Sequence, residues 1–275
     1  MIPTQLFKTH RLTVWIIGFL LLFAGMIQFV SVNEAAARAN LETITKKGVL
    51  RVGVALFTPW AFKGKDGKLI GFEMDVARKL AKDMGVTLKV ISYDWEKLIP
   101  ALKNGKIDII VAGMSITPQR ALNVNFSMPY ATSGVSLATH LEGTKHIKSI
   151  QELNHPSIKI GVISETVSEG LARRVFKKAS IVVFQKSNEA EDAIVSGKIQ
   201  AYVGSNPTPR FIALDHPGKV DVPLSKPLLA TETGFAVNKG DPDFLNFLNS
   251  WIISRKADTW LTSTHDYWFK SLKWK

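Results

Sequence analysis

Cysteine does not occur in this sequence of 275 residues. Its absence excludes disulfide bonds, thiolate metal sites and lipid attachment through an N-terminal cysteine. The six histidines show no metal-binding spacing, and there is no H-E-x-x-H motif. A G-x-S-x-G elbow and a phosphate-binding loop are also missing. We therefore expect no metal ion and no cofactor, and these motifs assign no catalytic residue.

Acidic residues are outnumbered, with 23 Asp and Glu against 35 Lys and Arg, so the net charge is +12. Such a charge raises the question of a nucleic-acid or anionic-membrane partner. The basic residues are scattered, without a long run or a nucleic-acid-binding motif. We interpret the charge as a solvated basic surface and expect no nucleic-acid partner. The length fits one large domain or two small ones.

The N-terminal residues 1–39 have the pattern of an export signal. Basic residues, including Lys8 and Arg11, precede an apolar run over residues 12–32, and Ala37-Arg38-Ala39 offers a cleavage site before Asn40. The apolar run is also long enough to cross a bilayer, so an uncleaved N-terminal membrane anchor is the alternative. Both interpretations place the remaining chain outside the cytoplasm, and we expect a periplasmic protein.

The segment IDIIVAGMSITPQRALNVNFSMPY, residues 107–130, carries the clearest chemical signal. Residues 107–112 form a short apolar, β-branched run that is typical of a buried strand. Thr117 suits the N-cap of a helix and Pro118 its first position, which places Arg120 in the first turn. Ligands bind α/β sheets at such strand ends, and an arginine fits a carboxylate with two bonds. The segment predicts a carboxylate site; an ordinary strand–turn–helix with a surface arginine is the alternative.

Strand and helix patterns alternate along the body of the chain. Expected strands cover residues 49–55, 87–91, 107–112, 158–163, 181–184, 199–203 and 234–237, with a further β-branched segment at 130–140. Expected helices run from Phe72 to Gly85, from Asp94 as N-cap to Gly105, over 150–153, from the capping box at Thr166 to Lys178, over 188–195, and from Phe244 to Trp260. The order predicts two α/β lobes with parallel sheets wrapped by helices.

Five segments of the chain together resemble the extracytoplasmic solute-binding proteins of the amino-acid-binding family, family 3. They are GVLRVGVALFTPWAF, DGKLIGFEMDVARKLA, GMSITPQRALNVNFSMPY, KIGVISETVSE and DPDFLNFLNSWI. The resemblance implies the type II periplasmic binding fold, in which two α/β lobes with mostly parallel sheets close over a ligand cleft. Two crossing strands, near 131–135 and 232–235, would divide the chain into lobe 1, residues 40–132 plus 233–275, and lobe 2, residues 133–232.

The resemblance also implies roles for single residues. Arg120 matches the arginine that grips the ligand carboxylate, and Ser115 matches a hydroxyl partner of that carboxylate. Gly113 matches a residue whose backbone carbonyl faces the ligand amino group. Thr166 falls where the second lobe offers a helix N-terminus to the carboxylate. For Ser115 and Thr166, plain turn formation or capping is the alternative.

Two aromatic residues complete the expected pocket. Phe57 and Trp95 match the positions that sandwich the ligand side chain, which favours a flat or aliphatic ligand body. Packing in the core is the alternative, above all for Trp95, which lies one helical turn from Leu98 and Ile99.

Two positions depart from the family pattern. Ser205 stands where members that bind α-amino acids usually carry the aspartate that pairs with the ligand ammonium. A buried ammonium without a charged partner is costly, so either another acid supplies the charge or the ligand is not a simple α-amino acid. Glu165 stands where the family often has glycine. It is a candidate for the substitute acid; an exposed loop residue is the alternative.

The resemblance leaves three hypotheses for function. The first is a monomeric binding protein that delivers an amino acid or related small carboxylate to the membrane subunits of an ABC importer, with no chemistry of its own. The second is an enzyme that resembles cyclohexadienyl dehydratase and acts on prephenate or arogenate, with Glu165 or Glu169 as proton donor. The third is a membrane-tethered sensor, if residues 12–32 stay uncleaved.

Overall fold

A computed structural model describes residues 39–271, 273 and 274. Residues 1–38 of the expected signal peptide or anchor, including its apolar run over residues 12–32, lie outside the described residues. Within the described part of the chain, no helix combines the length and apolar character needed to span a bilayer.

The first sheet combines strands from both ends of the chain: β1 (Val49–Val54), β4 (Thr87–Ser92), β5 (Ile109–Ile110), β6 (Asn125–Phe126) and β13 (Ala236–Val237). Their order is β4-β1-β5-β13-β6. β1 pairs in parallel with β4 and β5, whereas β13 is antiparallel to both β5 and β6. The expected parallel sheet is therefore a mixed sheet, because the returning C-terminal segment enters it from the opposite direction.

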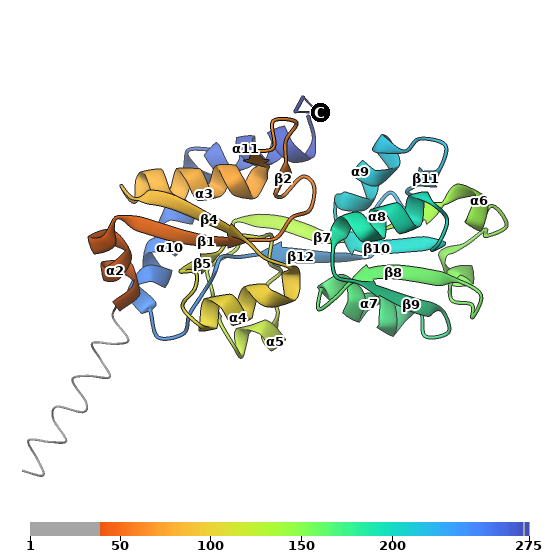
Figure 1. Ribbon diagram of the computed structural model, residues 1–275, viewed down its shortest axis with the longest axis horizontal. Coiled ribbons are helices and arrows are strands. Elements are labelled where there is room, and N and C mark those ends of the chain that lie inside the picture. Colours follow the sequence, from red (N-terminus) through yellow and green to blue (C-terminus); the bar gives the residue numbers. More distant parts are fainter. Residues whose placement is uncertain (1–38, 272, 275) are drawn as a thin grey trace, which may run out of the picture.

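Helices cover both faces of this sheet. They are α2 (Ala39–Lys47), α3 (Phe72–Asp83), α4 (Leu98–Lys103), α5 (Pro118–Ala121), α10 (Pro242–Ala257) and α11 (Trp260–Phe269), with a 3-10 turn η1 (Trp95–Lys97) and a small hairpin of β2 (Phe62–Lys63) and β3 (Leu69–Ile70). Figure 1 shows α3 and α11 on one side of the sheet and α4 and α5 on the other.

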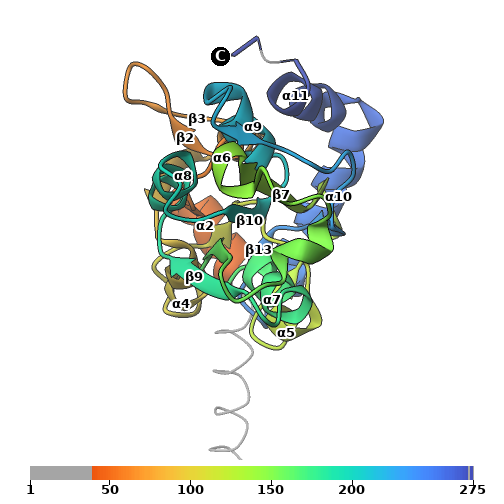
Figure 2. The same ribbon diagram turned by 90° about the vertical axis from the view of Figure 1, so that its right-hand side faces the viewer.

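The second sheet contains β7 (Ala131–His140), β8 (Lys159–Ile163), β9 (Ser180–Phe184), β10 (Ala201–Ser205), β11 (Val220–Asp221) and β12 (Leu229–Thr233). Its order is β11-β7-β10-β8-β9, and β12 also pairs with β7. β10, β8 and β9 are parallel, whereas β7 runs antiparallel to its neighbours. The helical segments are α6 (Leu141–Thr144), η2 (Ile150–Leu153), α7 (Val167–Val175), α8 (Ser187–Val195) and α9 (Thr208–Asp215). In Figure 2, α7 lies on one face of this sheet and α8 and α9 on the other.

β7 and β12 connect the two halves of the molecule. They pair antiparallel from Ala131 opposite Thr233 to Val135 opposite Leu229, so the chain leaves the first lobe and returns to it along adjacent strands. Figure 1 shows this pair running between the two lobes. Both expected crossing segments, 131–135 and 232–235, overlap the pair. Such a narrow, two-stranded connection suits a hinge between two rigid bodies.

The central strands of each sheet are buried on both faces, which explains why their sequences are continuous hydrophobic runs. In β5, Ile109 belongs to the core under α3 and Ile110 to the core under α4, and neither side chain is exposed to solvent. In β10, Val203 and Tyr202 divide in the same way between the two cores of the second lobe. Each lobe is thus a sheet buried between two helical layers.

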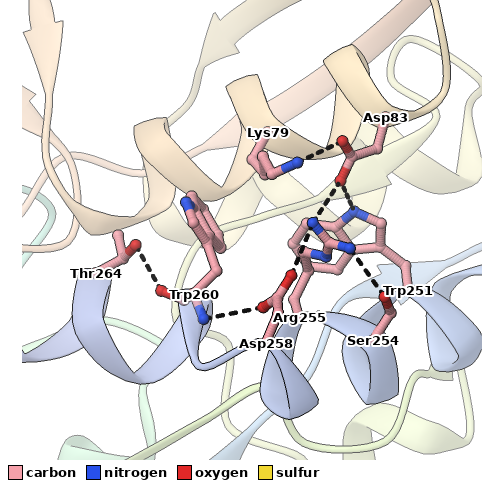
Figure 3. Close-up of polar contacts among 8 residues, drawn as sticks. All are labelled: Lys79, Asp83, Trp251, Ser254, Arg255, Asp258, Trp260 and Thr264. Atoms are coloured by element: carbon pink, nitrogen blue, oxygen red, sulfur yellow. Dashed lines mark hydrogen bonds and ion pairs between the residues drawn. The ribbon is translucent and has the colours of Figure 1, made fainter.

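Polar contacts of Asp83 attach α10 to α3 (Figure 3). The carboxylate of Asp83 accepts from Lys79 Nζ at 2.5 Å and from Trp251 Nε1 at 2.8 Å, with Arg255 3.7 Å away. Burial alone would raise the pKa of Asp83, but these hydrogen bonds and the two cations together hold the pKa below its ordinary value. The end of α3 and the middle of α10 are therefore joined by a charged cluster.

Several expected elements differ from the structure. The single helix expected from Phe244 to Trp260 is two helices, because Thr259 has a left-handed backbone with φ of 62° between α10 and α11. The helix begun at Thr166 ends at Val175 rather than Lys178. Asp94 makes no capping bond to η1; its carboxylate accepts from Lys97 instead. Helices α2 and α9 were not expected from the residue pattern.

Candidate functional site

A cavity of about 430 Å³ lies between the two lobes. It is lined at the carboxyl ends of β1, β4 and β5 in one lobe and of β8, β9 and β10 in the other. Ligands bind open α/β sheets at these ends. Seven expected site residues line the cavity: Phe57, Trp95, Gly113, Ser115, Arg120, Thr166 and Ser205.

Arg120 lies in the first turn of α5, as the sequence predicts. The hydroxyl of Thr117 caps this turn by accepting from the Arg120 backbone N–H at 3.2 Å, and Pro118 occupies the first helical position. The guanidinium donates to the Ser115 carbonyl at 3.0 Å and to the Glu165 carbonyl of the other lobe at 3.1 Å. Burial lowers the pKa of Arg120 to about 10, which still leaves the side chain a cation at neutral pH.

The two aromatic residues contact each other at the cavity. The ring centroids of Phe57 and Trp95 are 6.0 Å apart, and the rings meet edge to face at 71°. In this structure the rings do not face each other across a parallel slot. The Arg120 guanidinium lies 5.2 Å from the Trp95 ring centre, so the aromatic face also holds the cation.

The hydroxyl of Thr166 is already engaged within its own lobe. It donates to the Ile163 carbonyl at 2.7 Å and accepts from the Glu169 backbone N–H at 3.2 Å, which confirms the predicted cap of α7. The carboxylate of Glu169 accepts from the Glu165 backbone N–H and pairs with Arg173. Thr166, Val167 and Ser168 line the cavity, so the N-terminal end of α7 faces it.

Glu165 takes part in the site through its backbone. Its carbonyl accepts from Arg120 and, at 3.2 Å, from Trp95 Nε1, so it joins the lobes. Its φ of 56° lies in the left-handed region that glycine adopts freely, which gives a physical reason for the glycine that the family resemblance implies here. Glu165 is an exposed residue that lines a neighbouring hollow instead of the cavity, and its charge acts on Arg120 by raising the pKa of the guanidinium. Its place outside the cavity argues against the substitute-acid role.

Ser205 lies at the end of β10, on the wall formed by the second lobe. Its hydroxyl is 3.4 Å from the hydroxyl of Ser133, which also donates to the Asn206 carbonyl. Nearby, Thr208 donates to the Thr58 carbonyl of the first lobe at 2.9 Å. These contacts show that neutral hydroxyl groups surround Ser205 and that the lobes touch directly beside it.

Three charged residues of the cavity wall were not expected from the sequence: Asp94, Lys97 and Lys186. Lys97 Nζ contacts the Asp94 carboxylate at 2.5 Å, and this hydrogen bond lowers the pKa of Asp94 below its ordinary value, with Lys186 adding to the effect from the second lobe. In the sequence, Asp94 and Lys97 lie close to Trp95, and Lys186 follows β9, so their positions could have marked them as candidates. The residue pattern does not show, however, that these two segments meet across the cavity.

Glu73 supports the cavity from behind, and sequence reasoning missed it as well. Its carboxyl group is fully buried, accepts from Tyr130 Oη at 2.8 and 3.0 Å, and hydrogen-bonds to the backbone of Gly113. Gly113 has a φ of 58°, and a Cβ there would lie 2.8 Å from the Trp60 ring. Glu73 and Trp60 therefore fix the backbone that links the end of β5 to Ser115.

Comparisons with known proteins point to one family. The profile described as bacterial extracellular solute-binding proteins, family 3, matches residues 50–271. The L-cystine-binding protein of Escherichia coli (strain K12) is 28% identical over 252 residues, which is 90% of this chain and 91% of that protein. Cyclohexadienyl dehydratase of Pseudomonas aeruginosa is 25% identical over 248 residues, 90% of this chain and 92% of that protein.

Solved structures give the same fold. The crystal structure of an ancestral amino acid-binding protein, described as a precursor of cyclohexadienyl dehydratase, superposes with a TM-score of 0.75 and 38% identity. It covers 84% of this chain and 99% of its own. The expected two-lobe type II periplasmic binding fold is thereby confirmed.

The buried position of Glu73 predicts a pH-dependent stability. Burial raises the pKa of Glu73 from 4.5 to about 8 in the folded protein. Because the folded pKa is the higher one, this group favours folding most below pH 4.5, and that contribution declines up to pH 8, by at most about 1.4 kcal/mol per pH unit. Urea unfolding at pH 5 and pH 8 should show a smaller loss of stability for Glu73→Gln than for the unchanged protein.

Glu142→Gln is the matched control, because Glu142 is exposed and, among the described residues, forms an ion pair with the exposed Lys145 alone. Its pH dependence should equal that of the unchanged protein. If Glu73→Gln loses stability between pH 5 and pH 8 as steeply as this control, Glu73 does not bind its extra proton in the folded state.

Proposed function

Because the chain belongs to the bacterial extracellular solute-binding proteins of family 3, we propose that it is the substrate-binding component of an ABC importer. Its ligand would be an amino acid or related small carboxylate, bound in the cavity between the lobes. Its partners would be the membrane subunits of that importer, which it would serve as a periplasmic monomer. The observation that carries this proposal is the half-buried guanidinium of Arg120 on the cavity wall.

Carboxylate capture follows from the present contacts of Arg120. Its amino groups donate to two neutral carbonyls, those of Ser115 and Glu165. A carboxylate is a stronger acceptor than either carbonyl, since charge-assisted bonds are about twice as strong as neutral ones. Ser115 and the N-terminal end of α7 would add donors, and Phe57 and Trp95 would contact the ligand body. Direct bonds between the lobes would then hold the closed form around the ligand.

We propose that residues 40–132 plus 233–275 form lobe 1 and residues 133–232 form lobe 2. All strands of the first sheet lie in residues 49–126 and 236–237, and all strands of the second lie in residues 131–233. Each proposed boundary thus falls in the paired connection of β7 and β12.

We also propose that residues 1–39 are a cleaved signal peptide, supported by the motif before Asn40.

Because the chain is similar to a cyclohexadienyl dehydratase, a dehydratase activity is the alternative proposal. A dehydratase needs a proton donor beside the substrate. Of the two acids considered from the sequence, Glu165 lines the neighbouring hollow and Glu169 is paired with Arg173, and neither lines the cavity. Asp94 does line it, but Lys97 holds this carboxylate in its ionised form. These contacts favour binding without chemistry.

Removing the guanidinium should abolish ligand capture. A thermal-shift screen over amino acids, 2-oxo acids and small organic acids would first identify a ligand, and calorimetry would measure its affinity. Arg120→Ala should weaken binding at least about 100-fold, since two charge-assisted bonds contribute about 3 kcal/mol together. Arg210→Ala is the matched control, because Arg210 is exposed and outside the cavity wall. Unchanged affinity in a folded Arg120→Ala protein would contradict the proposal.

The proposed signal peptide predicts the mass of the exported protein. Export of the full-length chain in a bacterial host, followed by mass spectrometry of the periplasmic fraction, should give a mature chain that begins at Asn40. A full-length chain recovered from the membrane fraction would instead establish the N-terminal anchor.

If the protein binds its ligand without catalysing a reaction, it should not convert prephenate. Purified protein incubated with prephenate at neutral pH should form no phenylpyruvate above the rate of the buffer control. Formation that depends on the protein, and that Asp94→Asn removes, would establish the dehydratase alternative.

A further inference from the structure

We propose that the ligand of the cavity is a carboxylate without an ammonium group, a 2-oxo or 2-hydroxy acid, and that Ser205 sets this preference. The inference rests on the proposed function of the cavity and names its substrate class. It follows from the balance of charge on the cavity wall and from the kind of polar groups that the second lobe presents there.

Cations exceed anions on the wall of the cavity. Among the described residues that line it, Arg120, Lys97 and Lys186 are basic and Asp94 is the one acidic residue. Asp94 is already neutralised, because its carboxylate contacts Lys97 Nζ. It also lies towards the mouth, where its side chain is 30% exposed and that of Lys97 is 61% exposed. Because Lys97 pairs with Asp94 and Lys186 is exposed, the positive charge deeper in the cavity is that of Arg120, on which the exposed Glu165 acts from outside the lining.

The inner wall of the second lobe offers hydroxyl groups instead of carboxylates. Ser168 and Thr208 are almost completely buried, with 4% exposure each, and both line the cavity together with Ser205; the Thr208 hydroxyl already donates to the Thr58 carbonyl. Among the residues that the structure describes, the Ser205 hydroxyl has one hydrogen-bond contact, a long one of 3.4 Å to the Ser133 hydroxyl. It can therefore donate to a ligand oxygen or accept from a ligand hydroxyl. Neutral hydroxyls suit an oxo or hydroxy group on the carbon next to the carboxylate.

A zwitterionic ligand would leave this site with excess positive charge. Its carboxylate would balance Arg120, but the groups expected to meet its ammonium, the backbone of Gly113 and the hydroxyl of Ser205, are neutral, and Asp94 is already paired with Lys97. A desolvated ammonium without an anionic partner is strongly unfavourable. An oxo or hydroxy acid carries negative charge and no ammonium, which suits a lining on which Arg120 and Lys186 are not matched by a second acidic residue of that lining.

Matched ligand pairs test the inference directly, because they differ only at the group in question. We would measure affinities by calorimetry at pH 7 for phenylalanine, phenylpyruvate and phenyllactate, for leucine and 4-methyl-2-oxopentanoate, and for glutamate and 2-oxoglutarate. In each set that binds, the oxo or hydroxy acid should bind at least about 10-fold tighter than the amino acid, a difference of about 1.4 kcal/mol. An amino acid that binds as tightly as its oxo or hydroxy partner, or no binding by any oxo or hydroxy acid, overturns the inference.

Two variants test the role of Ser205. Ser205→Asp places a carboxylate on the wall, so it should weaken oxo-acid binding at least about 10-fold and strengthen amino-acid binding by a similar factor. Ser205→Asn is the matched control, since it has nearly the same shape as the aspartate but no charge, and it should keep the preference for the oxo acid. If Ser205→Asp leaves the preference unchanged while thermal unfolding shows an intact fold, Ser205 does not set it.

The inference about the ligand class and the proposed function can fail independently of each other. If amino acids bind tightly and Arg120→Ala abolishes that binding, the carboxylate-capture function stands and the present inference fails. If ligands bind equally well to Arg120→Ala, the proposed function itself fails.

Discussion

The guanidinium of Arg120 joins the two lobes and organises the cavity between them. It is held by the Ser115 carbonyl of its own lobe, by the Glu165 carbonyl of the other, and by the face of Trp95. Desolvation of this cation is unfavourable, and two neutral carbonyls compensate it only in part. The structure therefore keeps a partly buried positive charge at a place where an anion can enter, and the rest of the wall is arranged around that charge.

The residues that carry local signals were the ones that the sequence could place. Thr117 and Pro118 fix the start of α5 by capping and ring geometry, so Arg120 could be assigned to a first helical turn before its surroundings were known. The capping box at Thr166 did the same for α7. The family resemblance, confirmed by the matching profile, then predicted the two-lobe fold and the residues that line the cavity.

What the sequence did not reveal depends on contacts between distant segments. Lys186 reaches the neighbourhood of Asp94 only because β9 and the segment after β4 meet across the cavity, and no local pattern encodes that meeting. The burial of Glu73 was equally hidden, since an acidic residue in the first turn of a helix normally faces solvent. The break at Thr259 was missed because apolar periodicity continues through it, although the backbone does not.

The position of β13 has a consequence for the order in which the protein folds. This strand, residues 236 and 237, lies in the interior of the first sheet between β5 and β6. The second lobe is formed from one continuous stretch of chain, so its contacts are local and can form early. The first lobe cannot complete its sheet until the C-terminal segment is available for pairing. Its N-terminal part therefore stays incomplete until the end of the chain has been synthesised and, in an exported protein, has crossed the membrane.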